Sequence, residues 1–173
     1  MALVPPIGLS SAQVRDALLP LRNDFSVALA APGNAFAVGA VIRVAHSFLA
    51  KEIFVVGGKD YYRKAAMGMQ KYETVVHLDG PEELLRATAG RPLWAVEKDY
   101  AKRSICAVEG FPTGVVLLFG SERFGIPREL VERADDVVGI PMYGVNHSLP
   151  VAVAAGIAMH EWARRRYASG AVV

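Results

Sequence analysis

The continuous apolar segment 114–119 (GVVLLF) constrains the fold more than any other part of this 173-residue chain. It has no polar residue at alternate positions, so neither face of a strand formed by it can lie against solvent. Such strands occur in parallel sheets that helices cover on both faces. We therefore expect segment 114–119 to be the central strand of a parallel sheet.

Strand-like and helix-like segments alternate along the rest of the chain. The strand-like segments are short apolar runs, whereas the helix-like segments have apolar residues at helical spacing or open on a proline. Repeated strand–helix units predict an α/β fold, a mostly parallel sheet with helices on both faces. We expect strands at 25–30, 52–57, 74–78, 92–97, 114–119 and 136–140, and helices at 38–49, 61–69, 81–89, 127–133 and 150–167.

The composition predicts one domain and a second copy of the chain as its partner. No repeat, low-complexity run or polar linker divides the chain, so we expect a single domain over residues 1–173, with a short N-terminal lead of about residues 1–23. With glycine counted and tyrosine left out, about 59% of the residues are apolar, above the roughly 45–50% of soluble domains. Part of this apolar surface is expected to be buried in a homodimer.

Cysteine and hydropathy patterns exclude several classes of protein. The single cysteine, Cys106, leaves no disulfide framework and no cysteine-based zinc site. His77 and His160 have no partners at metal-ligand spacing, so we expect no metal. The longest uncharged apolar run, 149–159, is shorter than the roughly 20 residues that span a bilayer, and residues 1–10 have no basic leader. We expect a cytoplasmic protein with no membrane partner.

The candidate site lies in the segments that follow the expected strands, because ligands of open parallel sheets bind at the carboxyl ends of the strands. Three such segments are informative: 33–43, 119–127 (FGSERFGIP) and 140–151 (IPMYGVNHSLPV). Gly120 and Gly125 have the spacing of a phosphate-binding loop, but Ile126 and Pro127 replace the lysine and hydroxyl residue that such a loop requires. No G-x-G-x-x-G follows the first strand, which counts against an ordinary nucleotide-binding enzyme. That enzyme class stays open as an alternative.

Three polar residues in these segments have more than one interpretation. Glu122 is either a solvated turn residue or an acceptor of hydrogen bonds from loop amides that hold the site together. Ser148, just before a helix, is more often an N-cap than a functional residue. Arg43 on a polar helix face is usually a surface arginine.

Basic residues cluster between positions 59 and 71, and tyrosines lie among them. Such a segment suits neutralisation of RNA phosphates and stacking on bases, although a solvated helix face has the same composition. The basic residues are Lys59, Arg63, Lys64 and Lys71, the acid is Asp60, and the tyrosines are Tyr61, Tyr62 and Tyr72.

The order and sequence of these segments resemble the SpoU/TrmH family of SPOUT RNA 2′-O-ribose methyltransferases. An arginine-bearing helix, FGSERFGIP, IPM and a final S-L-x-V-x-V-A-A carry the resemblance, which covers about residues 27–166. It implies S-adenosyl-L-methionine as methyl donor and a tRNA or rRNA ribose 2′-hydroxyl as acceptor. It also implies a homodimer with the site near the interface and a C-terminal trefoil knot, which general topology rules would not predict.

The resemblance also implies roles for individual residues. Arg43, Glu122 and Ser148 match the catalytic positions of the family's three motifs. The positions that match its cofactor contacts are Val96, Gly120, Ile140 and Ser148, with Met142 and Leu149 as neighbours.

Two positions depart from the family pattern. Ala37 and Pro150 stand where the family has asparagines that position the catalytic groups. Asn34 and Asn146 lie close by in sequence and are possible substitutes, and Asn34 is counted among the expected catalytic residues. The alternative is a protein that binds cofactor or RNA with impaired or no methyl transfer.

Overall fold

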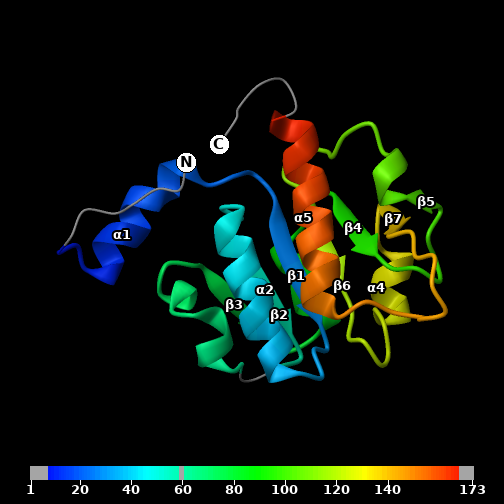
Figure 1. Ribbon diagram of the computed structural model, residues 1–173, viewed down its shortest axis with the longest axis horizontal. Helices are drawn as coiled ribbons and strands as arrows, with labels where there is room; N and C mark the ends of the chain where they lie inside the picture. Colours follow the sequence, from blue (N-terminus) through cyan, green and yellow to red (C-terminus); the bar gives the residue numbers. More distant parts are fainter. Residues whose placement is uncertain (1–7, 59–60, 168–173) are drawn as a thin grey trace.

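The computed structural model of the chain describes residues 8–58 and 61–167, which form a seven-stranded sheet (Figure 1). Its strands are β1 (Ser26–Ala30), β2 (Ile53–Val56), β3 (Val75–Leu78), β4 (Leu93–Val96), β5 (Arg103–Ser104), β6 (Val116–Phe119) and β7 (Asp136–Gly139). The order across the sheet is β3-β2-β1-β6-β4-β7-β5, and every pairing is parallel. The predicted parallel α/β architecture is therefore confirmed.

Strand β6 lies at the centre of the sheet, as the sequence predicts. It pairs with β1 on one side, where Val116 lies opposite Ser26, and with β4 on the other. All four of its residues are buried. Because side chains alternate across a strand, Leu117 and Phe119 enter the core on one face and Val116 and Leu118 the core on the other. This double burial explains why no polar residue interrupts the strand.

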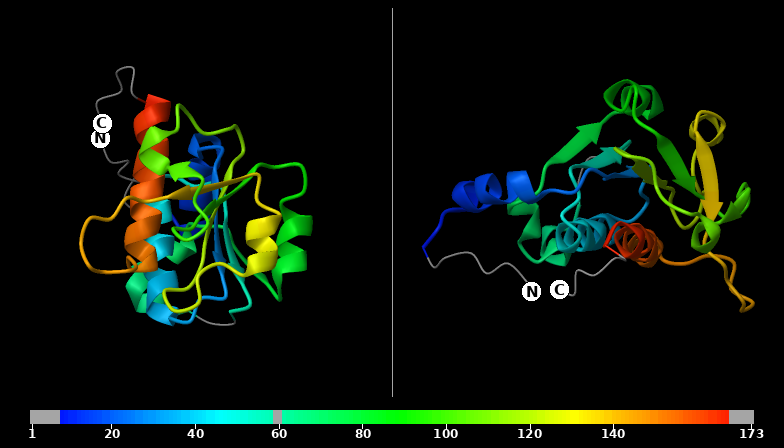
Figure 2. Two further views of the ribbon diagram at one scale, coloured as in Figure 1. Left: turned by 90° about the vertical axis from the view of Figure 1, so that its right-hand side faces the viewer. Right: turned by 90° about the horizontal axis from the view of Figure 1, so that it is seen from above.

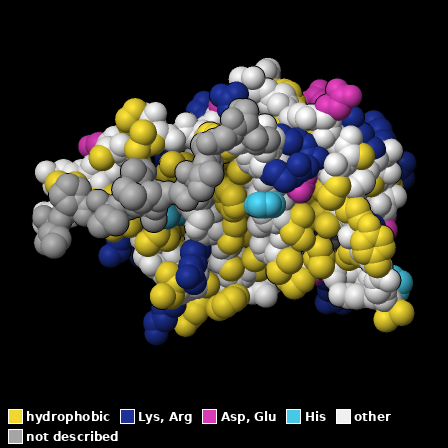
Figure 3. Space-filling model, turned by 45° about the horizontal axis from the view of Figure 1, so that its top comes forward, with side chains coloured by type: hydrophobic (Ala, Val, Ile, Leu, Met, Phe, Trp, Pro, Cys, Tyr) yellow, Lys and Arg dark blue, Asp and Glu magenta, His cyan; other side chains and the backbone are white. Residues whose placement is uncertain are grey.

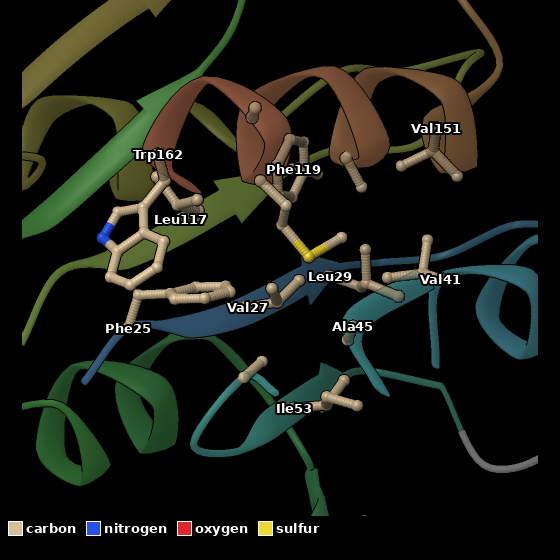
Figure 4. Close-up of a cluster of buried hydrophobic side chains, with 14 of the residues drawn as sticks. Phe25, Val27, Leu29, Val41, Ala45, Ile53, Leu117, Phe119, Val151 and Trp162 are labelled. Carbon is tan, nitrogen blue, oxygen red and sulfur yellow. The ribbon is translucent and has the colours of Figure 1, made fainter. Parts of the chain in front are cut away.

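Helices cover both faces of the sheet. Figure 2 shows α2 and α5 on one face and α3 and α4 on the other. In the α2/α5 layer the ring of Trp162 packs on Phe25 at 4.4 Å between centroids, and Phe119 lies beneath α5 (Figure 4). The helices are α1 (Ser11–Leu18), α2 (Ala35–Ser47), α3 (Pro81–Ala87), α4 (Arg128–Glu132) and α5 (Val151–Tyr167), and the short 3₁₀ turns are η1 (Leu19–Leu21), η2 (Arg63–Ala66), η3 (Met69–Lys71) and η4 (Ile105–Ala107).

The single helix predicted at 61–69 is wrong, because two 3₁₀ turns, η2 and η3, occupy this region. Met67 and Gly68 both adopt the left-handed conformation, with φ of 50° and 86°, which ends any helix there. The segment is instead shaped by its contact with α2. A Cβ on Gly39 would lie 2.6 Å from the carbonyl oxygen of Tyr62, so only glycine lets this segment approach α2 so closely.

The N-terminal lead contains a helix that we did not predict. Ser10 and Gln13 form a reciprocal capping box at the start of α1. After η1, the guanidinium of Arg22 binds both carboxylate oxygens of buried Glu73, and His46 Nδ1 lies 2.6 Å from Glu73 Oε1. This buried carboxylate therefore joins the lead to α2 and to the segment after η3. Within residues 8–58 and 61–167, no helix has the length and hydropathy needed to cross a membrane.

Candidate active site

Three loops at the carboxyl ends of β4, β6 and β7 surround a pocket of about 550 Å³. They comprise residues 96–100, 119–128 and 140–151, the last of which leads into α5. The pocket lies where parallel-sheet ligand sites are expected, beyond the carboxyl ends of the strands. Of the three segments singled out in the sequence, 119–127 and 140–151 meet here. Segment 33–43 does not line the pocket.

The loop after β6 closes on itself as a small hairpin. Ser121 and Gly125 exchange backbone hydrogen bonds of 3.2 and 2.9 Å, and the buried Ser121 hydroxyl accepts from the amide of Phe124 at 3.2 Å. A Cβ on Gly120 would collide with the carbonyl carbon of Gly125 and the amide nitrogen of Ile126. Gly120 and Gly125, which have the spacing of a phosphate-binding loop, therefore allow the backbone at residue 120 to lie directly against the backbone of residues 125 and 126.

Glu122 ties this hairpin to the start of the last helix. Its Oε1 accepts a hydrogen bond of 3.2 Å from the amide of Val151, the first residue of α5. A carboxylate is favoured there because the amides at a helix N-terminus carry partial positive charge. Glu122 is exposed and accepts this one backbone hydrogen bond, so it has features of both interpretations, and its role in the site stays a prediction.

Glu97, just after β4, is a pocket residue that the sequence analysis missed. Its Oε2 accepts from the amide of Ile126 at 3.2 Å, so it fixes the far side of the same hairpin. A Cβ on Gly125 would lie 2.7 Å from this oxygen, and Gly125 also has a φ of +65°. Glu97 and Glu122 thus hold the hairpin from two directions. The only sequence signal for Glu97 is its position at the end of an expected strand.

The residues expected to contact the cofactor all line this pocket. The other lining side chains include charged groups of both signs. One of them is Arg128, whose pKa is raised by its 2.7 Å hydrogen bond to Glu132. The expected residues are Val96, Gly120, Ile140, Met142, Ser148 and Leu149, and the further lining residues include Lys98, Asp99, Tyr100, Arg123, Phe124, His147 and Ala154.

Ser148 is not an N-cap, so the simpler interpretation of this residue is wrong. The first carbonyl acceptor of α5 belongs to Pro150, which receives the amides of Val153 and Ala154 at 2.9 and 3.0 Å. Ser148 lies two residues earlier, where its own carbonyl accepts from Asn146 Nδ2 at 2.7 Å. Its exposed side chain borders the pocket.

Arg43 and Asn34 lie away from the pocket of their own chain. Asn34 caps α2, where its Oδ1 accepts from the amide of Phe36 at 2.9 Å. Arg43 is exposed on α2. Helix α5 lies between α2 and the loops of the pocket (Figures 1 and 2). The structure therefore brings Glu122 and Ser148 to one cavity but not Arg43.

The tyrosines of the basic segment are mostly engaged within the fold. Tyr61 stacks on His77 with ring centroids 6.1 Å apart, and Tyr72 packs against His46. Tyr62 alone of the three is exposed, and its ring stacks on that of Phe36 at 6.1 Å. The side chains of Arg63, Lys64 and Lys71 are exposed, whereas Lys59 and Asp60 lie outside the described residues.

Comparison with known proteins agrees with this geometry. Residues 24–160 match the SpoU rRNA Methylase family. The chain belongs to this family. It is 35% identical over 104 residues to the tRNA (guanosine(18)-2′-O)-methyltransferase of Aquifex aeolicus, covering 60% of this chain and 49% of that protein. It is 30% identical over 135 residues to the 23S rRNA (guanosine-2′-O-)-methyltransferase RlmB of Ralstonia nicotianae, covering 75% and 54%.

Solved SpoU structures share the fold. The A. aeolicus TrmH/SpoU tRNA modifying enzyme superposes with a TM-score of 0.81 at 26% identity, over 92% of this chain and 84% of that one. The SpoU methyltransferase AviRb from Streptomyces viridochromogenes, in complex with AdoMet, superposes with a TM-score of 0.76 at 27% identity, over 87% and 64%. These likenesses support the C-terminal knot, which stays a prediction. This SpoU chain spans about half the length of the curated relatives named above.

Proposed function

We propose that the protein transfers the methyl group of S-adenosyl-L-methionine to the ribose 2′-hydroxyl of a tRNA or rRNA nucleotide. The observation that carries the proposal is the pocket, where Gly120, Glu122, Ile140 and Ser148 from the second and third motifs converge. Relatives named as tRNA and 23S rRNA 2′-O-methyltransferases support the reaction and the substrate class. A cytoplasmic location is part of this proposal, and it is supported by the tRNA and rRNA substrates named for the relatives.

The pocket has the size and chemistry to hold this cofactor. Its volume of about 550 Å³ falls within the roughly 300–1,000 Å³ of ligand sites. Val96, Ile140 and Leu149 offer apolar surface, and charged side chains of both signs suit a ligand that carries a carboxylate, an ammonium and a sulfonium. When bound, S-adenosyl-L-methionine supplies a methyl group made electrophilic by its sulfonium.

The chain's own residues position the acceptor and steady its charge. Transfer would join the 2′-oxygen to the methyl carbon while the carbon–sulfur bond gives its electron pair to sulfur, and the hydroxyl proton would pass to solvent water. Holding the reacting atoms in line supplies much of the rate. Arg43 donates hydrogen bonds but is a poor base, so we assign it to the developing alkoxide and an RNA phosphate. Glu122 holds the 119–128 hairpin against α5, beside Ser148.

We further propose that the protein acts as a homodimer. Hydrophobic side chains gather on the face that carries α2 and α5 (Figure 3), and Phe36 and Val153 are 59% and 47% exposed. Burial of such surface stabilises association. A second protomer would also bring an Arg43 to a pocket that its own chain's Arg43 does not line.

Ligand titration and methyl transfer test the proposed activity. We expect calorimetry to give heat with S-adenosyl-L-methionine or its demethylated product. Single-turnover assays with the radiolabelled cofactor should label an unmodified tRNA or rRNA transcript, and nucleoside mass spectrometry should place the label on a ribose. Tight cofactor binding with no label in either RNA would favour a binding protein. Heat with NAD or ATP alone would favour an ordinary nucleotide-binding enzyme.

The oligomeric state gives a separate prediction. We expect light scattering to report the dimer mass throughout a dilution series, because the α2/α5 face is apolar and the proposed mechanism takes Arg43 from the second copy. A well-folded monomer that still methylates RNA would contradict the dimer while leaving the activity in place.

A further inference from the structure

A second, smaller hollow of about 370 Å³ borders the cofactor pocket. It lies between the loop that joins β4 to β5, strand β5 itself and the loop that joins β7 to α5. Lys98, Ile140, Met142 and His147 line both cavities. A ligand in the second hollow would therefore meet a ligand in the first along this shared border.

The charged side chains of the second hollow are cationic. Lys98, Lys102 and Arg103 line it, and no aspartate or glutamate does so among residues 8–58 and 61–167. Ser104 and Asn146 add a hydroxyl and an amide, both of which can donate hydrogen bonds. This lining is suited to an anion with several oxygen acceptors.

Neighbouring acids neutralise this charge only in part. Arg103 donates hydrogen bonds from Nε and Nη2 to Asp136 Oδ2 at 3.1 and 2.6 Å, and Lys98 Nζ lies 3.3 Å from Asp99 Oδ1. Lys102, by contrast, makes no ion pair with any residue that the structure describes. One full positive charge thus stays available at the hollow.

The backbone that carries Lys102 is held in place. Its amide donates to the carbonyl of Val137 at 2.9 Å, which fixes it to β7. A Cβ on Gly139 would lie 2.9 Å from the Cβ of Ala101, so glycine at this position lets the two segments pack together. A pre-formed backbone lowers the entropy that ligand binding must overcome.

We propose that the second hollow binds a phosphodiester of the RNA strand whose ribose is methylated. This inference rests on the proposed function. The 2′-oxygen and the 3′-phosphate are carried by adjacent carbons of one ribose, so a site that presents the hydroxyl to the cofactor must receive a phosphate close by. The hollow that adjoins the cofactor pocket and offers Lys102 meets that need.

The test compares two single lysine replacements. Lys102→Ala removes the proposed contact. Lys51→Ala is the matched control, since Lys51 is exposed and precedes β2, which is the second strand from the opposite edge of the sheet. Both variants lose one positive charge. The probe is a fluorescent single-stranded RNA of about 12 mixed nucleotides, and its binding constant is measured at several KCl concentrations from about 50 to about 200 mM. In a plot of the logarithm of the binding constant against the logarithm of the salt concentration, each phosphate contact contributes about 0.7 to the magnitude of the slope.

We expect the salt slope of Lys102→Ala to be smaller than that of the unmodified protein by about 0.7, and the slope of Lys51→Ala to be unchanged. Cofactor affinity, measured by calorimetry, should stay within twofold for both variants. Equal slopes for the two variants would overturn the proposal. A tenfold loss of cofactor affinity in Lys102→Ala would also overturn it, because the hollow would then belong to the cofactor.

The outcome is separable from that of the proposed methyl transfer. RNA binding and its salt slope do not require catalysis, so they report on the hollow even if the unmodified protein labels no RNA. If the protein does methylate RNA, Lys102→Ala should raise the RNA concentration needed for half-maximal rate and leave the saturated single-turnover rate within about threefold. A loss in the saturated rate alone would contradict a phosphate contact.

Discussion

Replacing Arg43 by alanine is expected to lower the single-turnover rate of methyl transfer by about 10³-fold, while affinity for S-adenosyl-L-methionine stays within about threefold. Removal of one donor that faces developing negative charge costs about 10²–10³ in rate, and Arg43 is also assigned an RNA phosphate. The cofactor affinity should be unaffected because Arg43 is assigned to the ribose oxygen and an RNA phosphate, and the Arg43 of the same chain does not line the pocket. Calorimetry and single-turnover kinetics at saturating RNA measure the two quantities.

The matched control for this prediction is Arg86→Ala. Arg86 lies on α3, on the opposite face of the sheet, and its side chain is 75% exposed. The Arg86→Ala variant loses the same charge, and we expect it to keep the methyl-transfer rate and the cofactor affinity of the unmodified protein. An equal fall of binding and transfer in Arg43→Ala would make Arg43 a cofactor residue. Unchanged transfer would restore the simpler interpretation of Arg43 as a surface arginine.

The sequence predicts the sheet well because burial on two faces leaves few alternatives. Segment 114–119 is apolar throughout, and the structure places its strand at the centre of the sheet between β1 and β4. The long helices α2 and α5 also form within about three residues of their expected bounds, because they bury apolar stripes on the sheet.

Elements defined by contacts distant in sequence could not be predicted in this way. Strand β5 has two residues and exists through its pairing with β7. The two turns that replace the helix at 61–69 depend on the left-handed Met67 and on close approach to Gly39, and nothing local at Met67 signals this conformation. Helix α1 is different, because its capping box at Ser10 and Gln13 was a local signal.

The candidate site likewise contains residues that a sequence pattern identifies and residues that only contacts distant in sequence identify. The resemblance to a known family supplied Glu122 and Ser148, and the structure places both at one pocket. Glu97 could not be recognised, because its partner, the amide of Ile126, lies 29 residues away in the chain. At Ser148 the local pattern favours an N-cap, because a serine lies just before the helix, whereas the resemblance predicts a site residue, and Pro150 supplies the first carbonyl of α5.

Gly120→Ala is expected to lower affinity for S-adenosyl-L-methionine by about 100-fold or more. The added methyl group would collide with the backbone of Gly125 and Ile126, and no side chain can move aside to admit it. The hairpin must open, which breaks the paired hydrogen bonds between Ser121 and Gly125. Forcing extra volume into packed structure costs about 1–3 kcal/mol, and a loss of about 2.8 kcal/mol corresponds to 100-fold in affinity.

Gly110→Ala is the matched control, because a Cβ at Gly110 has no atom within 4 Å and the residue has no left-handed φ. It should keep the cofactor affinity and the thermal midpoint of the unmodified protein. Gly120→Ala should remain folded by circular dichroism, since most of the buried residues on both faces of the sheet lie outside the hairpin, which contributes Phe119 and Ile126. A folded Gly120→Ala protein with unchanged affinity would show that the cofactor does not bind against this hairpin, and the pocket would then lose its assignment as the methyl donor site.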